Sequence, residues 1–144
     1  MKNTPTKEQV LETMNRLSKD TLMETLNINY VDADPLTGKL VATMPVDSRV
    51  YQPMGILHGG ATVALAESVG SAASQMLIDS SKEMALGAEI SANHVKSART
   101  GLLIATAECI HHGKSSHLYH IRVENEQGEL ISMVKLLNFV KQRK

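Results

Sequence analysis

The fold is decided by the stretch His58-Gly-Gly-Ala-Thr-Val-Ala-Leu-Ala-Glu-Ser-Val-Gly-Ser-Ala-Ala-Ser-Gln-Met-Leu-Ile78. It is dense in Ala and other small residues and contains no Lys or Arg. A helix of this length would extend about 30 Å, the width of a small domain. Because a helix that is small or apolar nearly all round is usually buried, the sequence predicts a long central helix over about residues 58–78.

Glu67 is the one charged residue within that stretch. The residues three, four and seven positions away share its helical face and form a small, partly polar stripe: Gly60, Ala64, Ser71 and Ser74. Burial of an unpaired carboxylate is costly, so Glu67 indicates a cavity or a subunit seam. Isolated charges are mostly exposed, however, and the pattern alone leaves a solvent-facing helix edge as an equal alternative.

The segments around the long helix predict a sheet. Residues 7–26 have the apolar spacing of one surface helix, which Thr6 or Thr4 could cap. Six runs have β-like patterns, two before the long helix and four after it: 28–34, 39–46, 85–97, 102–112, 117–125 and 129–140. The breaks between the last four are short enough for hairpins, which favours an antiparallel meander.

These elements predict an α+β domain in which an antiparallel sheet of about five to six strands wraps around the long helix. Residues 1–144 are expected to form one domain, with residues 1–26 as an N-terminal helical segment.

Composition narrows the classes of partner. Fifteen basic residues balance fifteen acidic ones, whereas nucleic acid and anionic membrane surfaces favour a basic excess. Cys109 is the single cysteine, so an intrachain disulfide is impossible. No apolar run approaches the roughly 20 residues that span a bilayer. We therefore expect a cytoplasmic protein that binds neither nucleic acid nor membrane.

His58-Gly59-Gly60 stands where the long helix should begin. The unpaired N–H groups and the positive dipole end of a helix attract a polarised carbonyl oxygen, and Gly permits close approach of a ligand. Together with a carboxylate two turns further on, this end has the groups needed for acyl transfer, an oxyanion donor and a nucleophile or base. A Gly pair that simply makes a tight turn before the helix remains an alternative.

Histidines crowd one expected hairpin. If residues 113–116 are its loop, His112 faces His117 and Cys109 faces His120, and Cys109, His111 and His120 share one face. Such a set could mimic zinc ligands. The spacing matches no standard zinc motif, so we interpret these as polar hairpin residues and expect no metal site.

The segment from Gln52 to Ser71 resembles the signature of hotdog-fold thioesterases that use a helix carboxylate. These enzymes act on 4-hydroxybenzoyl-CoA, on 1,4-dihydroxy-2-naphthoyl-CoA or on aroyl groups attached to carrier proteins. A second block, from Gly87 to Gly101, is also similar to this family. The resemblance covers roughly residues 25–140 and is specific to the fold and to thioester chemistry rather than to one acyl group.

The resemblance implies a role for each matching residue. Glu67 would be the nucleophile or general base, and the Gly59 N–H would polarise the thioester carbonyl. Gln52 and His58 would orient the carbonyl and the attacking water, and Ser71 would assist hydrolysis. From the residues alone, His58 could instead cap the helix and the Ser71 hydroxyl could bond to the preceding turn.

A second set of matching residues would bind the rest of the substrate. His94, Lys96 and Arg99 fall where relatives hold the pantetheine arm and the nucleotide phosphates. Gly60 and Met54 complete the predicted binding set, although Met54 stands where many relatives carry an aromatic residue. Without the resemblance, Lys96 and Arg99 would be ordinary solvated charges.

The resemblance therefore implies hydrolysis of an acyl-CoA, with an aromatic acyl group favoured, to the free acid and CoA. It implies no cofactor beyond the CoA of the substrate, and a homodimer or homotetramer with its active site at the subunit interface. An acyl carrier protein is a further expected partner. A non-catalytic binding module for acyl-CoA or acyl carrier protein is the alternative. A hydratase of this fold is disfavoured because no Asp lies on the helix around Glu67.

Overall fold

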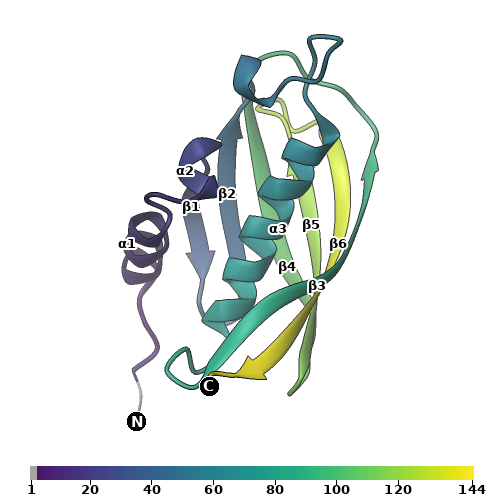
Figure 1. Cartoon of the computed structure of the whole chain (residues 1–144). Helices are drawn as coiled ribbons and strands as arrows, with labels where there is room; N and C mark the ends of the chain where they lie inside the picture. The colour runs from purple at the N-terminus through teal and green to yellow at the C-terminus, as the bar shows by residue number, and fades with distance from the viewer. Residues whose placement is uncertain (1–2) are drawn as a thin grey trace.

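The computed structural model describes residues 3–144. Six strands form one antiparallel sheet in the order β1-β2-β4-β5-β6-β3: β1 (Asn29–Asp34), β2 (Lys39–Pro45), β3 (Glu83–His94), β4 (Leu102–His112), β5 (Ser116–Glu124) and β6 (Leu130–Gln142). The sheet curls around one long helix, α3 (Gly59–Met76), which crosses its concave face (Figure 1). The predicted α+β architecture is therefore confirmed.

Small side chains let α3 lie deep in the concave face of the sheet. Its apolar stripe of Leu65, Ala66, Val69 and Ala73 is completely buried. Gly70 shows how close the helix comes, because a Cβ there would lie 2.7 Å from a methyl carbon of Leu136 on β6. The Ala- and Gly-rich composition of the stretch is thus a packing requirement of the concave sheet.

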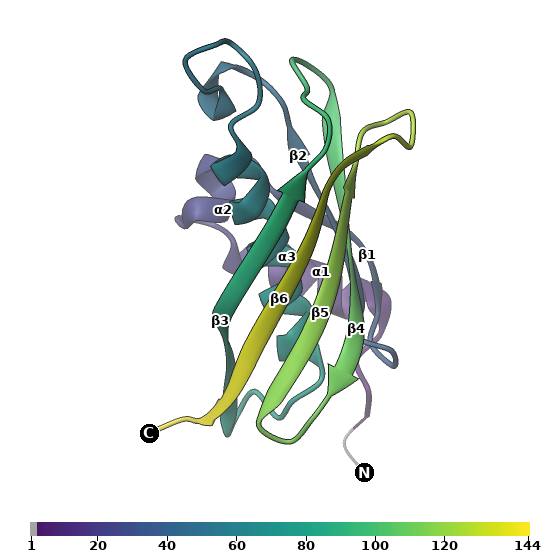
Figure 2. The same cartoon turned by 90° about the vertical axis from the view of Figure 1, so that its right-hand side faces the viewer.

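The expected meander of the last four strands is wrong at its first step. β3 pairs with β6, not with β4, and forms one edge of the sheet. Residues 95–101 do not make a hairpin. They run past the start of α3, where the Leu57 N–H donates to the Ala98 carbonyl and the Val46 N–H donates to the Gly101 carbonyl. Figure 2 shows β3 beside β6, with the chain then crossing back to β4.

The N-terminal segment forms two helices rather than the single helix expected over residues 7–26: α1 (Lys7–Leu17) and α2 (Leu22–Thr25). The predicted Thr6 cap is confirmed as part of a capping box with Gln9. The break follows from local chemistry. Asp20 adopts a left-handed φ of 60°, and the Thr21 side chain accepts from the Met23 N–H, which starts a new helix.

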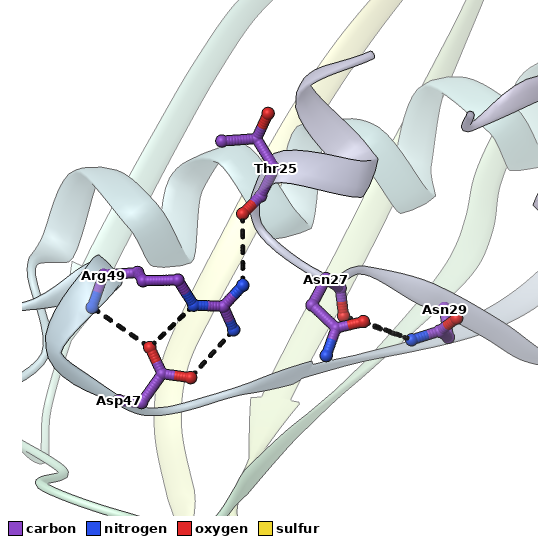
Figure 3. Close-up of polar contacts among 5 residues, drawn as sticks. All are labelled: Thr25, Asn27, Asn29, Asp47 and Arg49. Atoms are coloured by element: carbon purple, nitrogen blue, oxygen red, sulfur yellow. Dashed lines mark hydrogen bonds and ion pairs between the residues drawn. The ribbon is translucent and has the colours of Figure 1, made fainter. Parts of the chain in front are cut away.

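The loop after β2 is tied to α2. It contains a short 3-10 helix, η1 (Ser48–Val50), capped by the Asp47 side chain. Arg49 makes a two-pronged contact with Asp47, with N–O distances of 3.0 and 2.8 Å, and its third nitrogen donates to the Thr25 carbonyl at 3.4 Å (Figure 3). This clamp anchors the segment that leads to Gln52 and α3.

The histidine hairpin departs from its expected register. His112 does face His117, with their rings edge to face, but a bulge at Ile110 pairs Cys109 with Tyr119 and Glu108 with His120. The face predicted to hold Cys109 with His120 therefore does not form. Within residues 3–144, no group of three His, Cys, Asp or Glu side chains is arranged to hold a metal ion.

The two edges of the sheet differ. At the β1 edge, the Asn15 side chain of α1 donates to and accepts from the backbone of Tyr30, both at 2.9 Å, so it occupies part of that edge. The β3 edge extends over twelve residues and is largely exposed. An exposed strand edge is a template for pairing with another chain. No helix in the described part of the chain is long and apolar enough to cross a membrane.

Candidate active site

Hydrogen bonds that involve side chains help to fix the position of α3. The Tyr30 hydroxyl donates to the Ser68 carbonyl at 3.3 Å, and the Asn138 amide donates to the Gly70 carbonyl at 3.2 Å. Near the C-terminal end of the helix, Ser74 bonds to His117 at 2.6 Å. Burial raises the pKa of Tyr30 to about 12, so this phenol remains a donor at neutral pH. These contacts set the rotation of the helix, and with it the direction in which Glu67 points.

Glu67 lies half-buried against the exposed edge strand. Its carboxylate covers Gly87 of β3, where an added Cβ would overlap Oε1 and lie 3.3 Å from Cδ. Gly87 thus leaves room that any other residue would fill. The carboxylate therefore lies at the boundary of the fold, along the edge strand β3.

The start of α3 adjoins a cavity of about 310 Å³. Gly59 and Thr62 of the helix line it, together with His94 at the end of β3, Lys96 just after that strand and Ser132 of β6. Among the described residues, none accepts a hydrogen bond from the Gly59 N–H. This N–H, at the positive end of an 18-residue helix, can therefore bind a carbonyl oxygen that carries negative charge.

His94 is held against Gly59. Its Nδ1 bonds to the buried Ser132 hydroxyl at 2.6 Å, and its Nε2 lies 2.7 Å from where a Cβ on Gly59 would be. The imidazole and the first residue of α3 therefore form one wall of the cavity. A side chain at position 59 would displace the imidazole, so Gly is required here by close approach rather than by backbone conformation.

His58 and Gln52 shape the turn that leads into α3. His58 is the N-cap, and its Nδ1 accepts from the Gly60 N–H at 2.8 Å. The capping alternative is thus confirmed, and Nδ1 acts as the acceptor. The Gln52 side-chain oxygen accepts from the Met54 N–H. Met54 itself is 78% exposed and is not among the residues that line the cavity at the start of α3.

The two predicted CoA-binding cations lie on the segment that follows β3, where Lys96 lines the cavity and Arg99 does not. Lys96 pairs with Glu129, and this hydrogen bond is the main reason that the pKa of Glu129 lies below its ordinary value. The Arg99 side chain is exposed, while its carbonyl accepts from the Tyr51 hydroxyl. Both side chains are exposed, and Lys96 is already paired with a carboxylate.

One chain does not bring all of the predicted residues together. Gly59, Gly60, His94 and Lys96 cluster at one end of α3, and Glu67 and Ser71 lie further along it. Eight residues of helix separate the Gly59 N–H from Glu67 by about 12 Å, more than a Glu side chain can reach.

Sequence reasoning missed three residues beside the predicted ones. Asn138 lies directly opposite Gly87 in the β3–β6 register and is completely buried. Ser132 orients His94, and Thr62 lines the cavity. Asn138 and Ser132 belong to a strand that alternates buried and exposed residues, so an inward-facing polar residue was the available signal.

The chain is similar throughout to thioesterases. A model of the thioesterase superfamily matches residues 54–132. The 1,4-dihydroxy-2-naphthoyl-CoA hydrolase of Escherichia coli is 39% identical over 88% of this chain and 90% of its own. The proofreading thioesterase EntH of Cronobacter turicensis is 41% identical over 85% of this chain and 87% of its own.

A crystal structure supports the same relation. A mutant of thioesterase PA1618 from Pseudomonas aeruginosa superposes with a TM-score of 0.90 at 37% identity, over 99% of this chain and 98% of its own. The agreement extends over the sheet, α3 and the N-terminal helices.

Proposed function

The chain belongs to the thioesterase superfamily and is a thioester hydrolase of the hotdog fold, and from that premise we propose that it hydrolyses an aromatic acyl-CoA to the free acid and CoA. The observation that carries the proposal is the half-buried Glu67 carboxylate, held over Gly87 on an otherwise small and apolar helix. The naphthoyl-CoA substrate in the name of the E. coli relative supports the aromatic acyl group.

The active site is built from two copies of the chain. Glu67 of one copy and the Gly59 N–H of the other act on the same carbonyl, since one chain holds them about 12 Å apart. The long exposed β3 edge, next to Glu67, supports pairing of two β3 strands about a twofold axis. A homodimer is then the smallest active unit, and a homotetramer is a pair of such dimers.

In the reaction, the thioester oxygen accepts a hydrogen bond from the Gly59 N–H, and negative charge develops on it. Along one route Glu67 attacks the carbonyl carbon, the C–S bond breaks with its electron pair on sulfur, and water then hydrolyses the anhydride. Along the other, Glu67 takes a proton from a water whose oxygen attacks. The tetrahedral intermediate then expels the thiolate, which takes up the proton.

The remaining predicted residues bind or orient the substrate. Gln52 and His58, in the turn before α3, orient the carbonyl and the attacking water. His94 shapes the wall beside Gly59, and the exposed cations Lys96 and Arg99 attract the phosphates of CoA. Gly60 and Met54 lie at the same end as Gly59, where Met54 meets the acyl group only if a second copy covers it.

The test is thiol release from a panel of aromatic and aliphatic acyl-CoAs, together with an aroyl carrier protein. Glu67→Gln should lower kcat by about 10²–10⁴-fold, the range for loss of a general base, while CoA binding stays close to that of the wild type. Glu108→Gln removes an exposed carboxylate from β4, away from the β3 edge, and should leave turnover unchanged. Near-normal turnover of Glu67→Gln would refute the assignment, and tight binding of acyl-CoA without any thiol release would favour a binding module.

A further inference from the structure

Asn138 is a completely buried amide that faces α3 from the middle of β6. Its Nδ2 donates to the Gly70 carbonyl at 3.2 Å, and its Oδ1 lies 3.3 Å from the Ser71 hydroxyl. Both contacts fall on the helical turn that follows Glu67. A buried amide that joins two elements can hold the helix in place. These two partners also fix which way the Asn138 amide and the Ser71 O–H group point.

The orientation follows from which of the Gly70 carbonyl, the Asn138 amide and the Ser71 hydroxyl can donate a hydrogen bond. The Gly70 carbonyl can only accept, so the Asn138 nitrogen must face it. The amide oxygen is then left facing Ser71. Since that oxygen can only accept, the Ser71 hydroxyl must donate to it, and its proton points towards β6. The lone pairs of Ser71 Oγ are left directed away from Asn138.

The Asn138–Ser71 pair adjoins the Glu67 carboxylate. Gly87, which that carboxylate covers, is the residue paired with Asn138 across the β3–β6 ladder. Ser71 lies four residues after Glu67 and so one turn along the same helix face. Glu67, Ser71 and Asn138 therefore surround one small region above Gly87.

We propose that Asn138 is a positioning residue for hydrolysis, because its amide oxygen accepts a hydrogen bond from the Ser71 hydroxyl and leaves Ser71 Oγ as an acceptor for the attacking water. This inference rests on the proposed thioesterase function. A water that donates one proton to Glu67 and the other to Ser71 presents an oxygen lone pair to the carbonyl carbon. If the Ser71 hydroxyl were free to rotate, it could donate to that same lone pair and make the water a poorer nucleophile.

The test is a double-mutant cycle of Asn138→Leu and Ser71→Ala, with kcat, KM and melting temperature measured for each variant. Asn138→Leu removes both amide contacts at similar size and should lower kcat by about tenfold, with KM nearly unchanged. In the Ser71→Ala background the same substitution should change kcat less than about twofold, because no hydroxyl remains to be oriented. It should still lower the melting temperature in both backgrounds.

Asn138→Asp is the conservative variant. A buried carboxyl that faces the Gly70 carbonyl is favoured in its protonated form, so its O–H replaces the amide N–H while its other oxygen accepts from Ser71. It should keep kcat within about threefold of the wild type, measured at pH 6, and it decides the question if Asn138→Leu does not fold.

Equal losses of kcat from Asn138→Leu in both backgrounds would assign Asn138 a structural role alone and overturn the inference. An unchanged kcat, or an Asn138→Asp variant as slow as Asn138→Leu, would do the same. Absence of thiol release by the wild type would instead refute the proposed function, and this inference with it.

Discussion

Replacement of Gly87 by Ala should separate activity from stability. The structure gives the displacement that this methyl group would cause. A Cβ at Gly87 overlaps Glu67 Oε1, and the carboxylate must withdraw by about 1 Å to reach an ordinary contact of 3.4 Å. Because the obstructed atom is the end of a flexible side chain, the carboxylate moves and the backbone does not.

The consequences for rate and for stability have opposite signs. A misplacement of about 1 Å at a reacting group can cost about 10²-fold in rate, or about 2.7 kcal/mol in the activation free energy. Gly87 is not among the glycines with positive φ, so Ala fits its backbone. A compatible Gly→Ala change adds about 0.4–1 kcal/mol to the free energy of unfolding.

The assay is thiol release at saturating acyl-CoA, with urea unfolding and the assembly mass measured on the same preparations. Ser91→Thr is the matched control, because it adds one methyl group to β3 on the face opposite α3, beside the exposed Lys135. We expect Gly87→Ala to lose about 10²-fold in kcat at unchanged or higher stability. Wild-type turnover, or a loss of turnover matched by loss of folded protein, would refute this reasoning.

Three further predictions concern stability. Thr62 is a buried residue whose hydroxyl oxygen has no hydrogen-bond partner in the described chain, so Thr62→Val should raise the free energy of unfolding by about 1 kcal/mol, and a decrease in urea midpoint would contradict this. The pKa of His117 is lowered, first by burial, so the unfolded chain takes up a proton that the folded chain does not. The free energy of unfolding should therefore fall as pH drops below 6.5, and it should fall less steeply in His117→Gln. Thermal unfolding between pH 5 and 8 measures this, and an equal pH dependence in both proteins would contradict the prediction. Asn15→Ala removes two hydrogen bonds to the Tyr30 backbone and should lower the free energy of unfolding by about 1–3 kcal/mol. An undetectable change in urea unfolding would contradict this and would mean that water replaces the amide.

The features that could be predicted from sequence are those set by local pattern. The helix over residues 58–78 could be predicted because small and apolar residues continue for five turns with a single charge among them. The Thr6 cap could be predicted from the residues next to it. Glu67 stood out because it was the one charge on that helix. What its carboxylate touches was not predictable, since Gly87 meets it through the fold rather than along the chain.

The errors arose where pairing depends on distant segments. The sequence break at residues 99–101 looks like a hairpin, but β3 gains more by pairing with β6 along eleven residues. The bulge at Ile110 shifts Cys109 by one position relative to β5, and a shift of one residue reverses the face of a strand. Asn138 was missed for a similar reason. Its role depends on contacts with Gly70 and Ser71 of α3, which the sequence of the strand does not show.

The most direct test of the account is complementation between two inactive variants. Glu67→Gln removes the carboxylate. Gly59→Pro removes the N–H at the first position of α3, where Pro is well tolerated, and the extended His58 backbone, with ψ of 125°, suits a residue before Pro. Gly59→Ala is the matched control, since it places the same Cβ against His94 but keeps the N–H.

Equal amounts of the Glu67→Gln and Gly59→Pro chains are unfolded together, refolded and assayed for thiol release. If each site combines Glu67 of one copy with Gly59 of the other, half of the pairs are mixed and each mixed pair has one complete site. Since half of the pairs then have one complete site out of two, about a quarter of wild-type activity should be recovered from two inactive parents. A mixture that remains as inactive as its parents, while wild type refolds to full activity, would contradict it.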